Sequence, residues 1–378
     1  MAGIYLHVPF CKQACHYCDF HFVTSLRYKE DMLDAMKKEL RLRKGFFGPE
    51  QIETIYFGGG TPSVLTAEEI KSILNEITEL YPVANHAEIT LEANPDDLNA
   101  QKVKALSGSP INRFSIGVQS FFDADLCWMN RPHNAVEAES SIKRAQDSGF
   151  ENITIDLIYG FPLLTDEKWR SNIQKALELE VPHISSYSMT VEPRTALASF
   201  INKGKQVSMD DAQSAAQFIV LMDLLNKGGF EHYEISNFAK SGFYSKHNSN
   251  YWKGEKYIGI GPSAHSYNGE TRSWNIANNN KYLEALNKGI IPETVEELSQ
   301  LDKVNEYIMT SLRTIWGLDL GRIASEFGTD YRSMTEKSIQ IFLEKDQLKR
   351  NDNIVTLTTS GKLFADHIAS ELFIIDRP

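Results

Sequence analysis

The sequence has no long hydrophobic run, no excess of basic residues and few cysteines, and each shortage excludes a class of protein. No stretch approaches the roughly 20 apolar residues that a membrane-spanning helix needs, and no low-complexity tract is present. Lysine and arginine number 39 against 50 acidic residues, a net charge of −11. We therefore expect neither a nucleic-acid surface nor binding to anionic membranes. We expect a cytoplasmic protein that is not integral to a membrane.

Three of the four cysteines stand in the first 22 residues, as Cys11, Cys15 and Cys18. A disulfide is not expected, because an acidic chain without an apolar signal segment belongs in a reducing compartment. Thiolates suit iron–sulfur clusters, Zn or Cu(I). Three thiolates are one fewer than a structural zinc ion or an electron-transfer cluster normally takes. The trio therefore predicts a metal centre with one open coordination position.

The three cysteines have two alternative interpretations, covalent heme attachment and a structural zinc ion. Covalent heme attachment fails, because Cys18 is followed by Asp19 and not by histidine. Cys127 has no assigned role, and a lone cysteine of this kind is most often a small buried hydrophobe. A structural zinc ion could take its fourth ligand from one of four side chains: His7, His16, His21 or Cys127.

Short β-branched or aromatic runs alternate with amphipathic stretches along the first half of the chain. This alternation is typical of βα units and a parallel sheet. Thr66 and Glu69 form a capping box that marks the start of a helix over 66–81. We predict six strands, at residues 3–9, 54–58, 87–94, 113–120, 152–159 and 183–190. With 378 residues, one barrel of about 200 to 250 residues and a smaller appendage is the expected partition.

Strand alternation separates a polar from an apolar face in the third to fifth predicted strands. The polar face carries Thr90, Glu92, Asn94, Ser115, Gly117, Gln119, Thr154 and Asp156. The opposite face is apolar throughout, as expected where helices cover it. A closed barrel fills its interior with branched side chains, so polar positions predict a more open barrel that holds a ligand. A solvated face of an ordinary two-layer sheet is the alternative.

Glycines follow the second predicted strand, in the turn Gly58-Gly59-Gly60-Thr61-Pro62. Such a turn lets a ligand approach the backbone and leaves N–H groups for an anionic or amino-acid group. It matches neither common phosphate-binding motif, so nucleotide binding is not implied.

Residues 241–273 form a polar, aromatic-rich segment that we expect to be a loop. Two interpretations stay open: a pocket for a flat aromatic ligand, or a plug at one end of the barrel. The segment carries His247, Tyr251, Trp252, Tyr257, His265 and Tyr267.

The last 80 residues predict a small, mostly helical, winged-helix-like domain. Lysines and arginines are not clustered there, which favours packing or partner docking over DNA binding. The expected division is 1–195 for the core barrel, 196–295 for its extension and 296–378 for the C-terminal domain. The C-terminal helices are expected at 298–314, 320–327, 335–345 and 361–372, with a hairpin at 348–356.

The cysteine trio Cys11, Cys15 and Cys18, together with the Gly59-Gly60-Thr61-Pro62 turn, resembles the radical S-adenosylmethionine (SAM) superfamily. Its nearest group is the oxygen-independent coproporphyrinogen III oxidase-like family. The resemblance implies a partial, open (β/α)6 barrel. It also implies a [4Fe–4S] cluster on the three cysteines, with the amino and carboxylate groups of SAM on the fourth iron.

Carried over position by position, the resemblance also implies a set of SAM contacts. Glu92, Gln119 and Asp156 in this set lie on the polar strand face. The full set is Tyr5, Tyr17, Gly59, Gly60, Thr61, Glu92, Gln119, Arg131 and Asp156.

Two features favour the heme-chaperone branch of that family. Phe20 stands where oxidising members carry a further cysteine, and residues 247–252 read His-Asn-Ser-Asn-Tyr-Trp, the HNxxYW motif of the chaperone branch. The start of the chain, close to the first predicted strand, fits the same branch. Members of this branch are thought to bind heme and pass it to an acceptor protein, which here is unknown and could be membrane-bound. His247 is the candidate heme contact.

Two further functions remain as alternatives. The first is an oxygen-independent coproporphyrinogen III oxidase, which oxidises a tetrapyrrole propionate side chain after SAM is cleaved to a 5′-deoxyadenosyl radical. The second is a zinc-stabilised adaptor that uses its terminal domain to bind protein or DNA.

Overall fold

The computed structural model describes residues 2–375, and its centre is a run of six parallel strands. Neighbours in the chain are neighbours in the sheet, and every pair from β1·β2 to β5·β6 is parallel. The six predicted strands are confirmed. They are β1 (Ala2–Val8), β2 (Ile52–Gly59), β3 (Val83–Ala93), β4 (Arg113–Gln119), β5 (Ile153–Tyr159) and β6 (His183–Ser188).

The sheet continues at both ends and does not close. Among the described residues it has 12 strands, in the order β12-β11-β10-β9-β1-β2-β3-β4-β5-β6-β8-β7. Strand β9 (Lys256–Ile260) pairs parallel to β1. Strands β10 (His265–Tyr267), β11 (Thr271–Asn275) and β12 (Glu293–Glu297) follow antiparallel. On the other side, the sheet continues with a hairpin of two short strands, β7 (Glu231–Glu234) and β8 (Asn237–Ala239). The open barrel expected from the polar strand face is confirmed.

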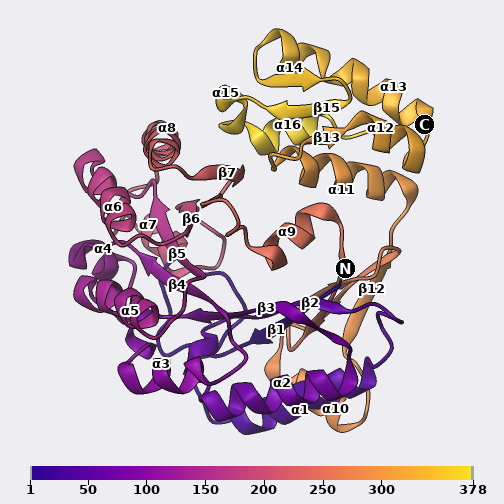
Figure 1. The fold of residues 1–378 in the computed structure, drawn as a ribbon. Coiled ribbons are helices and arrows are strands. Elements are labelled where there is room, and N and C mark those ends of the chain that lie inside the picture. The colour runs from indigo at the N-terminus through magenta and orange to yellow at the C-terminus, as the bar shows by residue number, and fades with distance from the viewer. Residues whose placement is uncertain (1, 376–378) are drawn as a thin grey trace.

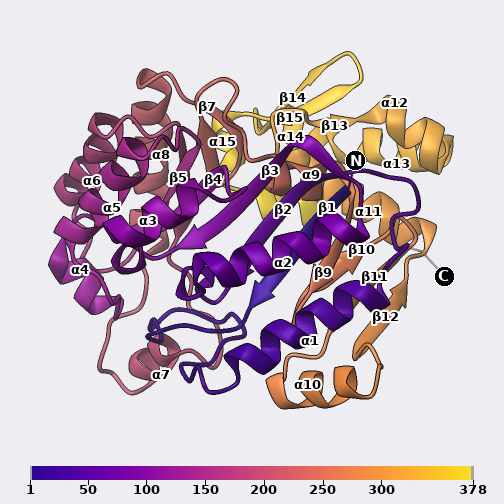
Figure 2. The same cartoon turned by 60° about the horizontal axis from the view of Figure 1, so that its bottom comes forward.

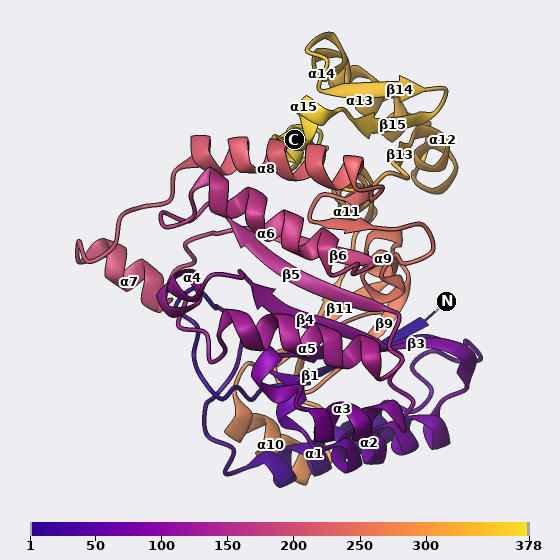
Figure 3. The same cartoon turned by 60° about the vertical axis from the view of Figure 1, so that its left-hand side comes forward.

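Helices cover the outer face of the parallel strands (Figures 2 and 3). The capping box of Thr66 and Glu69 is present, and α2 begins at the next residue, Ala67. The helices of this layer and its extension are α1 (Lys29–Leu42), α2 (Ala67–Leu80), α3 (Ala100–Ser107), α4 (Asp123–Trp128), α5 (Ala135–Asp147), α6 (Asp166–Glu178), α7 (Ala196–Asn202) and α8 (Asp211–Lys227).

The two strand faces differ as predicted. Leu91, Ile116 and Ile155 point to the helix layer and are fully buried in the main hydrophobic core. The alternate positions Glu92 and Asp156 point into the barrel and line a cavity. The apolar face is removed from water by the helices, while the polar face is left to a ligand.

Residues 241–273 are not the loop that we expected. They form α9 (Lys246–Lys253), β9 (Lys256–Ile260), β10 (His265–Tyr267) and β11 (Thr271–Asn275), and α10 (Asn279–Asn287) and β12 (Glu293–Glu297) follow. Ser245 accepts from the N–H of Asn248 and caps α9, and Gly254, with φ 72°, ends it. The pairing of β9 with β1 joins Ala2 to Lys256, and local composition does not reveal pairing between residues so far apart in the chain.

The C-terminal domain has a hydrophobic core of its own, which runs from Val304 to Leu372. Its elements follow the predicted winged-helix-like order, with a three-stranded sheet β13-β15-β14. They are α11 (Gln300–Leu312), β13 (Leu318–Asp319), α12 (Leu320–Arg322), a π-helical turn η3 (Ile323–Phe327), α13 (Thr329–Ser338), α14 (Gln340–Glu344), β14 (Leu348–Asn351), β15 (Ile354–Leu357), α15 (Thr359–Lys362) and α16 (Ala365–Glu371). The predicted fold class is confirmed.

Helix α9 lies between the sheet and the C-terminal domain (Figure 1) and contacts both β2 and α11. The first hydrophobic core extends from Ala2 to Leu286 and so includes residues from both the predicted barrel and its predicted extension. No helix within residues 2–375 combines the length and apolar character needed to cross a bilayer.

Candidate functional site

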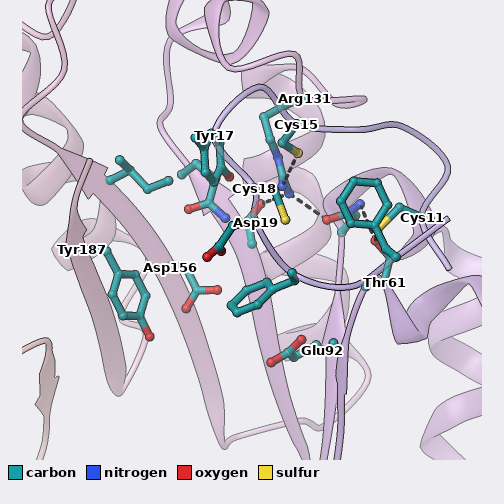
Figure 4. Close-up of a pocket in the computed structure, with 18 of the residues that line it drawn as sticks. Cys11, Cys15, Tyr17, Cys18, Asp19, Thr61, Glu92, Arg131, Asp156 and Tyr187 are labelled. Atoms are coloured by element: carbon teal, nitrogen blue, oxygen red, sulfur yellow. Dashed lines mark hydrogen bonds between the residues drawn. The ribbon is translucent and has the colours of Figure 1, made fainter. Parts of the chain in front are cut away.

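A cavity of about 420 Å³ opens at the carboxyl ends of the parallel strands. Figure 4 shows the side chains that point into it from the cysteine loop and from the strand ends. Every predicted site residue lines this cavity except Tyr5 and His247. The lining includes Cys11, Cys15, Tyr17, Cys18, Gly59, Gly60, Thr61, Glu92, Gln119, Arg131 and Asp156.

The cysteine loop is held in place by the segment that follows α4. The His16 N–H donates to the Met129 carbonyl over 3.0 Å, and the Asn130 side-chain amide donates to the Ala14 carbonyl over 2.7 Å. Lys12 pairs with Asp96 at 2.8 Å on the other side. These three contacts tie the cysteine loop to the barrel.

Two of the thiols accept hydrogen bonds from cavity residues. The Thr61 hydroxyl lies 3.3 Å from the Cys11 sulfur, and the Arg131 guanidinium lies 3.3 Å from the Cys15 sulfur. Burial raises the pKa of the Cys11 thiol to about 11 and that of Cys18 to about 12. Both thiols are therefore protonated near neutral pH, and a metal that binds them must displace protons.

The three cysteines line one cavity. Within residues 2–375 no three His, Cys, Asp or Glu side chains are close enough together to hold a single metal ion. In a cubane cluster each cysteine binds a different iron. Spaced thiols fit a cluster of this type better than they fit one zinc ion.

The N–H groups of Gly60 and Thr61 in the glycine turn are paired within the chain. The N–H of Gly60 donates to the Val8 carbonyl over 2.9 Å and that of Thr61 donates to the Phe10 carbonyl over 2.7 Å, so neither is left for a ligand. A Cβ on Gly60 would lie 2.6 Å from the Phe10 carbonyl oxygen. Glycine is required because the turn packs tightly against the chain that leads into Cys11. The prediction of free N–H groups at Gly60 and Thr61 was wrong, because these groups extend the pairing with β1.

Buried polar atoms without partners face the cavity. Among the described residues, Gln119 Oε1 and Arg131 Nε are buried and have no hydrogen-bond partner. A buried polar atom without a partner costs about 1–3 kcal/mol. One unmatched acceptor and one unmatched donor on residues of the same cavity fit the amino and carboxylate ends of an amino-acid ligand such as SAM.

Gln119 reaches this position through an unusual backbone. Its φ is 68°, in the left-handed region, and the pairing of β4 with β5 is irregular between Ile116 and Gln119. A non-glycine residue in this region is uncommon, and such conformations are frequent at functional sites.

Two buried carboxyl groups complete the polar lining. Burial raises the pKa of Glu92 to about 8, although a hydrogen bond from the Tyr56 hydroxyl at 2.8 Å opposes the shift. Burial also raises the pKa of Asp156 to about 6, opposed by the positive charge of Arg131. A cationic ligand would favour the charged form of both groups.

The cavity lining also contains residues that the sequence analysis did not assign to the site. Phe20 is 67% exposed, and Phe22, Tyr187, Met189 and Glu192 also line the opening. Tyr187 and Met189 come from the end of β6 and just beyond it. The rule that parallel strands carry sites at their carboxyl ends would have found both residues.

Tyr5 does not reach the cavity. Its hydroxyl lies 3.3 Å from His7 Nδ1, and its ring stacks on Tyr56 with centroids 6.1 Å apart. Tyr5 therefore lies beneath the cavity floor, and its predicted place beside the cofactor stays a prediction.

His247 lies at the opposite end of β2 from the cavity. Its Nδ1 is 2.8 Å from the Thr54 hydroxyl, and its Nε2 is 2.8 Å from the Tyr251 hydroxyl. The side chain is buried, and the backbone N–H of His247 donates to Glu88 over 3.0 Å. An iron ligand needs a free ring nitrogen, and both nitrogens are engaged. This geometry favours the plug interpretation, while heme contact by His247 stays a prediction.

Comparison with known protein families gives two matches. Residues 5–176 match the radical SAM superfamily, and residues 298–364 match the HemN C-terminal domain. The first match includes the cysteine loop, and the second lies in the separate C-terminal core.

Full-length relatives are similar to the whole chain. The heme chaperone HemW of Bacillus subtilis is 35% identical, with 97% of this chain and 98% of the relative covered. HemW of Lactococcus lactis is also 35% identical, over 98% and 97% respectively.

A solved structure gives the fold. Coproporphyrinogen III oxidase HemN from Escherichia coli, a radical SAM enzyme, superposes with a TM-score of 0.85 over 98% of this chain and 90% of that one, at 21% identity. At that identity the likeness concerns the fold alone. From the cysteine loop, the open barrel and the full-length relatives, we conclude that the chain belongs to the HemW family of the radical SAM superfamily.

Proposed function

We propose that the protein is a heme chaperone, which binds heme and transfers it to an acceptor protein. Its relatives over the full length carry that name. The single observation on which the cofactor assignment depends is that Cys11, Cys15 and Cys18 share one cavity with Glu92 and Asp156.

In this proposal Cys11, Cys15 and Cys18 hold a [4Fe–4S] cluster. A cluster held by three cysteines offers one open iron and one-electron redox chemistry. The unmatched atoms of Gln119 and Arg131 then bind the amino-acid end of SAM, and the other cavity residues in the set complete the contacts.

We further propose that the protein acts in the cytoplasm. The three thiols are free and must stay reduced to take up iron, which fits a reducing compartment. The heme acceptor is a second protein, either dissolved in the cytoplasm or held at a membrane.

The cofactor content is tested on anaerobically purified, reconstituted protein. Iron, sulfide and heme are measured on the same sample, and SAM is added while the cluster is followed by electron paramagnetic resonance. We expect about four irons and four sulfides per chain and a spectrum that changes with SAM. Zinc without iron or sulfide would support the adaptor alternative.

Heme transfer is tested by loading the protein with hemin and removing free heme by gel filtration. The loaded protein is mixed with an apo-cytochrome, or with apomyoglobin as a passive heme trap. Transfer to the apo-cytochrome that is faster than release to the trap supports delivery. Equal rates would mean that heme simply dissociates.

The oxidase alternative is tested on the same reconstituted protein. Anaerobic incubation with coproporphyrinogen III and SAM, followed by product analysis, should give no protoporphyrinogen. Robust conversion would replace the chaperone proposal with the enzymatic one.

A further inference from the structure

A second cavity lies at the junction of the sheet edge and the C-terminal domain, far in the chain from the cysteine loop. Its volume is about 150 Å³. We refer to it as the junction cavity, and the residues that matter in it are His232, Glu234, Arg313, Lys349, Thr356 and Lys362. Its wall includes the segment 313–315, which pairs with β7 through the N–H of Ile315 and the Tyr233 carbonyl at 3.0 Å.

Two lysines from the C-terminal domain point to this cavity. Lys349 is on β14, directly across the hairpin from Thr356. Lys362 ends α15 and lines the same cavity, where the charge of Lys349 repels its ammonium group. Burial and this repulsion lower the pKa of Lys362 to about 8.

The hydrogen-bond partner of Lys362 is neutral. His232 Nε2 lies 2.9 Å from the Ile235 carbonyl, so Nε2 carries the hydrogen and Nδ1 is an acceptor. The Lys362 ammonium donates to that Nδ1 over 2.9 Å. Burial lowers the pKa of His232 to about 3, so the ring is uncharged at neutral pH.

The carboxylates of this region are engaged elsewhere. One oxygen of Glu234 lies 3.2 Å from the Arg313 guanidinium, and the other accepts from the side chain of Asn237 at 2.6 Å. Asp366 also pairs with Arg313. Within residues 2–375, neither Lys349 nor Lys362 is paired with a carboxylate.

Two ammonium groups at one cavity, neither of them paired with a carboxylate, form a site for negative charge. We propose that the junction cavity binds a small oxyanion, of the phosphate or carboxylate type, between Lys349 and Lys362. The Thr356 hydroxyl supplies a further donor. The bound anion contacts the C-terminal domain and faces His232 on β7, so it strengthens the docking of that domain on the sheet. This site is separate from the cofactor cavity and goes beyond the proposed function.

The test is calorimetric titration of the full chain with inorganic phosphate, at constant ionic strength set with sodium chloride. We expect saturable binding of about one phosphate per chain and a rise in melting temperature with phosphate concentration. Lys362→Gln should weaken binding at least tenfold, and Lys349→Gln several-fold. Lys337→Gln, an exposed lysine on α13, is the matched control and should leave binding unchanged.

Lys362→Arg keeps the charge and should bind phosphate nearly as well as the unmodified chain, which separates loss of charge from loss of folding. A parallel titration with acetate distinguishes a phosphate ligand from a carboxylate ligand. Stronger binding of phosphate indicates a phosphate ligand, and stronger binding of acetate indicates a carboxylate ligand. The proposal is overturned if neither anion binds saturably, or if Lys362→Gln binds as well as the Lys337→Gln control.

Discussion

The hydroxyl of Tyr56 donates a hydrogen bond to Glu92 Oε1 across 2.8 Å. The same tyrosine ring stacks on His247, with centroids 4.9 Å apart. Tyr56 thus connects the cofactor cavity with helix α9, both of which lie on the inner face of the strands. A change in the charge of Glu92 therefore alters the hydrogen bond of a tyrosine that packs against α9.

Glu92 should make stability depend on pH. The ordinary pKa of a glutamate is 4.5, and that of folded Glu92 is about 8. The folded chain holds a proton that the unfolded chain releases, so the stabilising contribution is full below pH 4.5 and is lost as the pH rises through 8. We expect the metal-free protein to lose stability over this window and Glu92→Gln to flatten the profile, as measured by urea unfolding.

Glu284→Gln, an exposed carboxylate on α10, is the control and should leave the pH profile unchanged. An identical slope in Glu92→Gln and in the unmodified chain would show that Glu92 does not titrate in this range.

Removal of the Tyr56 hydroxyl should move the loss of stability to higher pH. The hydrogen bond from Tyr56 stabilises charged Glu92 and so lowers its pKa. In Tyr56→Phe the pKa of Glu92 rises further, and the loss of stability begins at higher pH. The same urea series measures the shift. A downward shift would contradict the assigned direction of the hydrogen bond.

Each cysteine of the trio should be needed for the cluster. Cys11→Ala, Cys15→Ala and Cys18→Ala each remove one of three iron ligands, and we expect iron and sulfide content to fall to a small fraction after anaerobic reconstitution. Cys127→Ala is the matched control, because Cys127 is exposed and does not line the cavity. Loss of the cluster in that variant would require a new account of the ligands.

Arg131 should contribute to SAM affinity. Its guanidinium donates to Asn94 Oδ1 over 2.7 Å and leaves Nε unmatched at the cavity. A charge-assisted hydrogen bond is worth about 1.5–3 kcal/mol, so Arg131→Gln should weaken SAM binding by about 10- to 100-fold. Arg131→Lys keeps the charge and should lose less.

Equilibrium dialysis with labelled SAM on reconstituted protein measures both variants. Arg144→Gln is the control, because Arg144 lies on α5 and donates to the Leu98 carbonyl. Unchanged affinity in Arg131→Gln would remove Arg131 from the set of SAM contacts.

His247→Ala should lower stability and leave the heme spectrum unaltered. The substitution leaves the hydroxyls of Thr54 and Tyr251 without their partner and opens a cavity in a packed region, which costs on the order of 2–4 kcal/mol. Thermal unfolding and hemin titration measure the two effects separately. A changed Soret band with normal stability would instead support His247 as an iron ligand.

Local patterns in the sequence determined much of this protein. The strands β1 to β6 were predictable because their apolar and polar positions alternate within a few residues, as at Leu91 and Glu92. The cysteine spacing predicted a metal centre because ligands from one short loop stay close together in any fold. The cavity positions Glu92, Gln119 and Asp156 on successive strands followed from the parity rule together with the family resemblance.

Tertiary structure alone decided the remainder. The pairing of Gly60 and Thr61 with residues 8–10 used N–H groups that a local reading leaves free. The left-handed backbone of Gln119 depends on how β4 meets β5. Helix α9 places His247 beneath the barrel because its N-terminus is anchored by Glu88, 159 positions away. Contacts across such distances depend on chain closure and packing, which no short window of sequence contains.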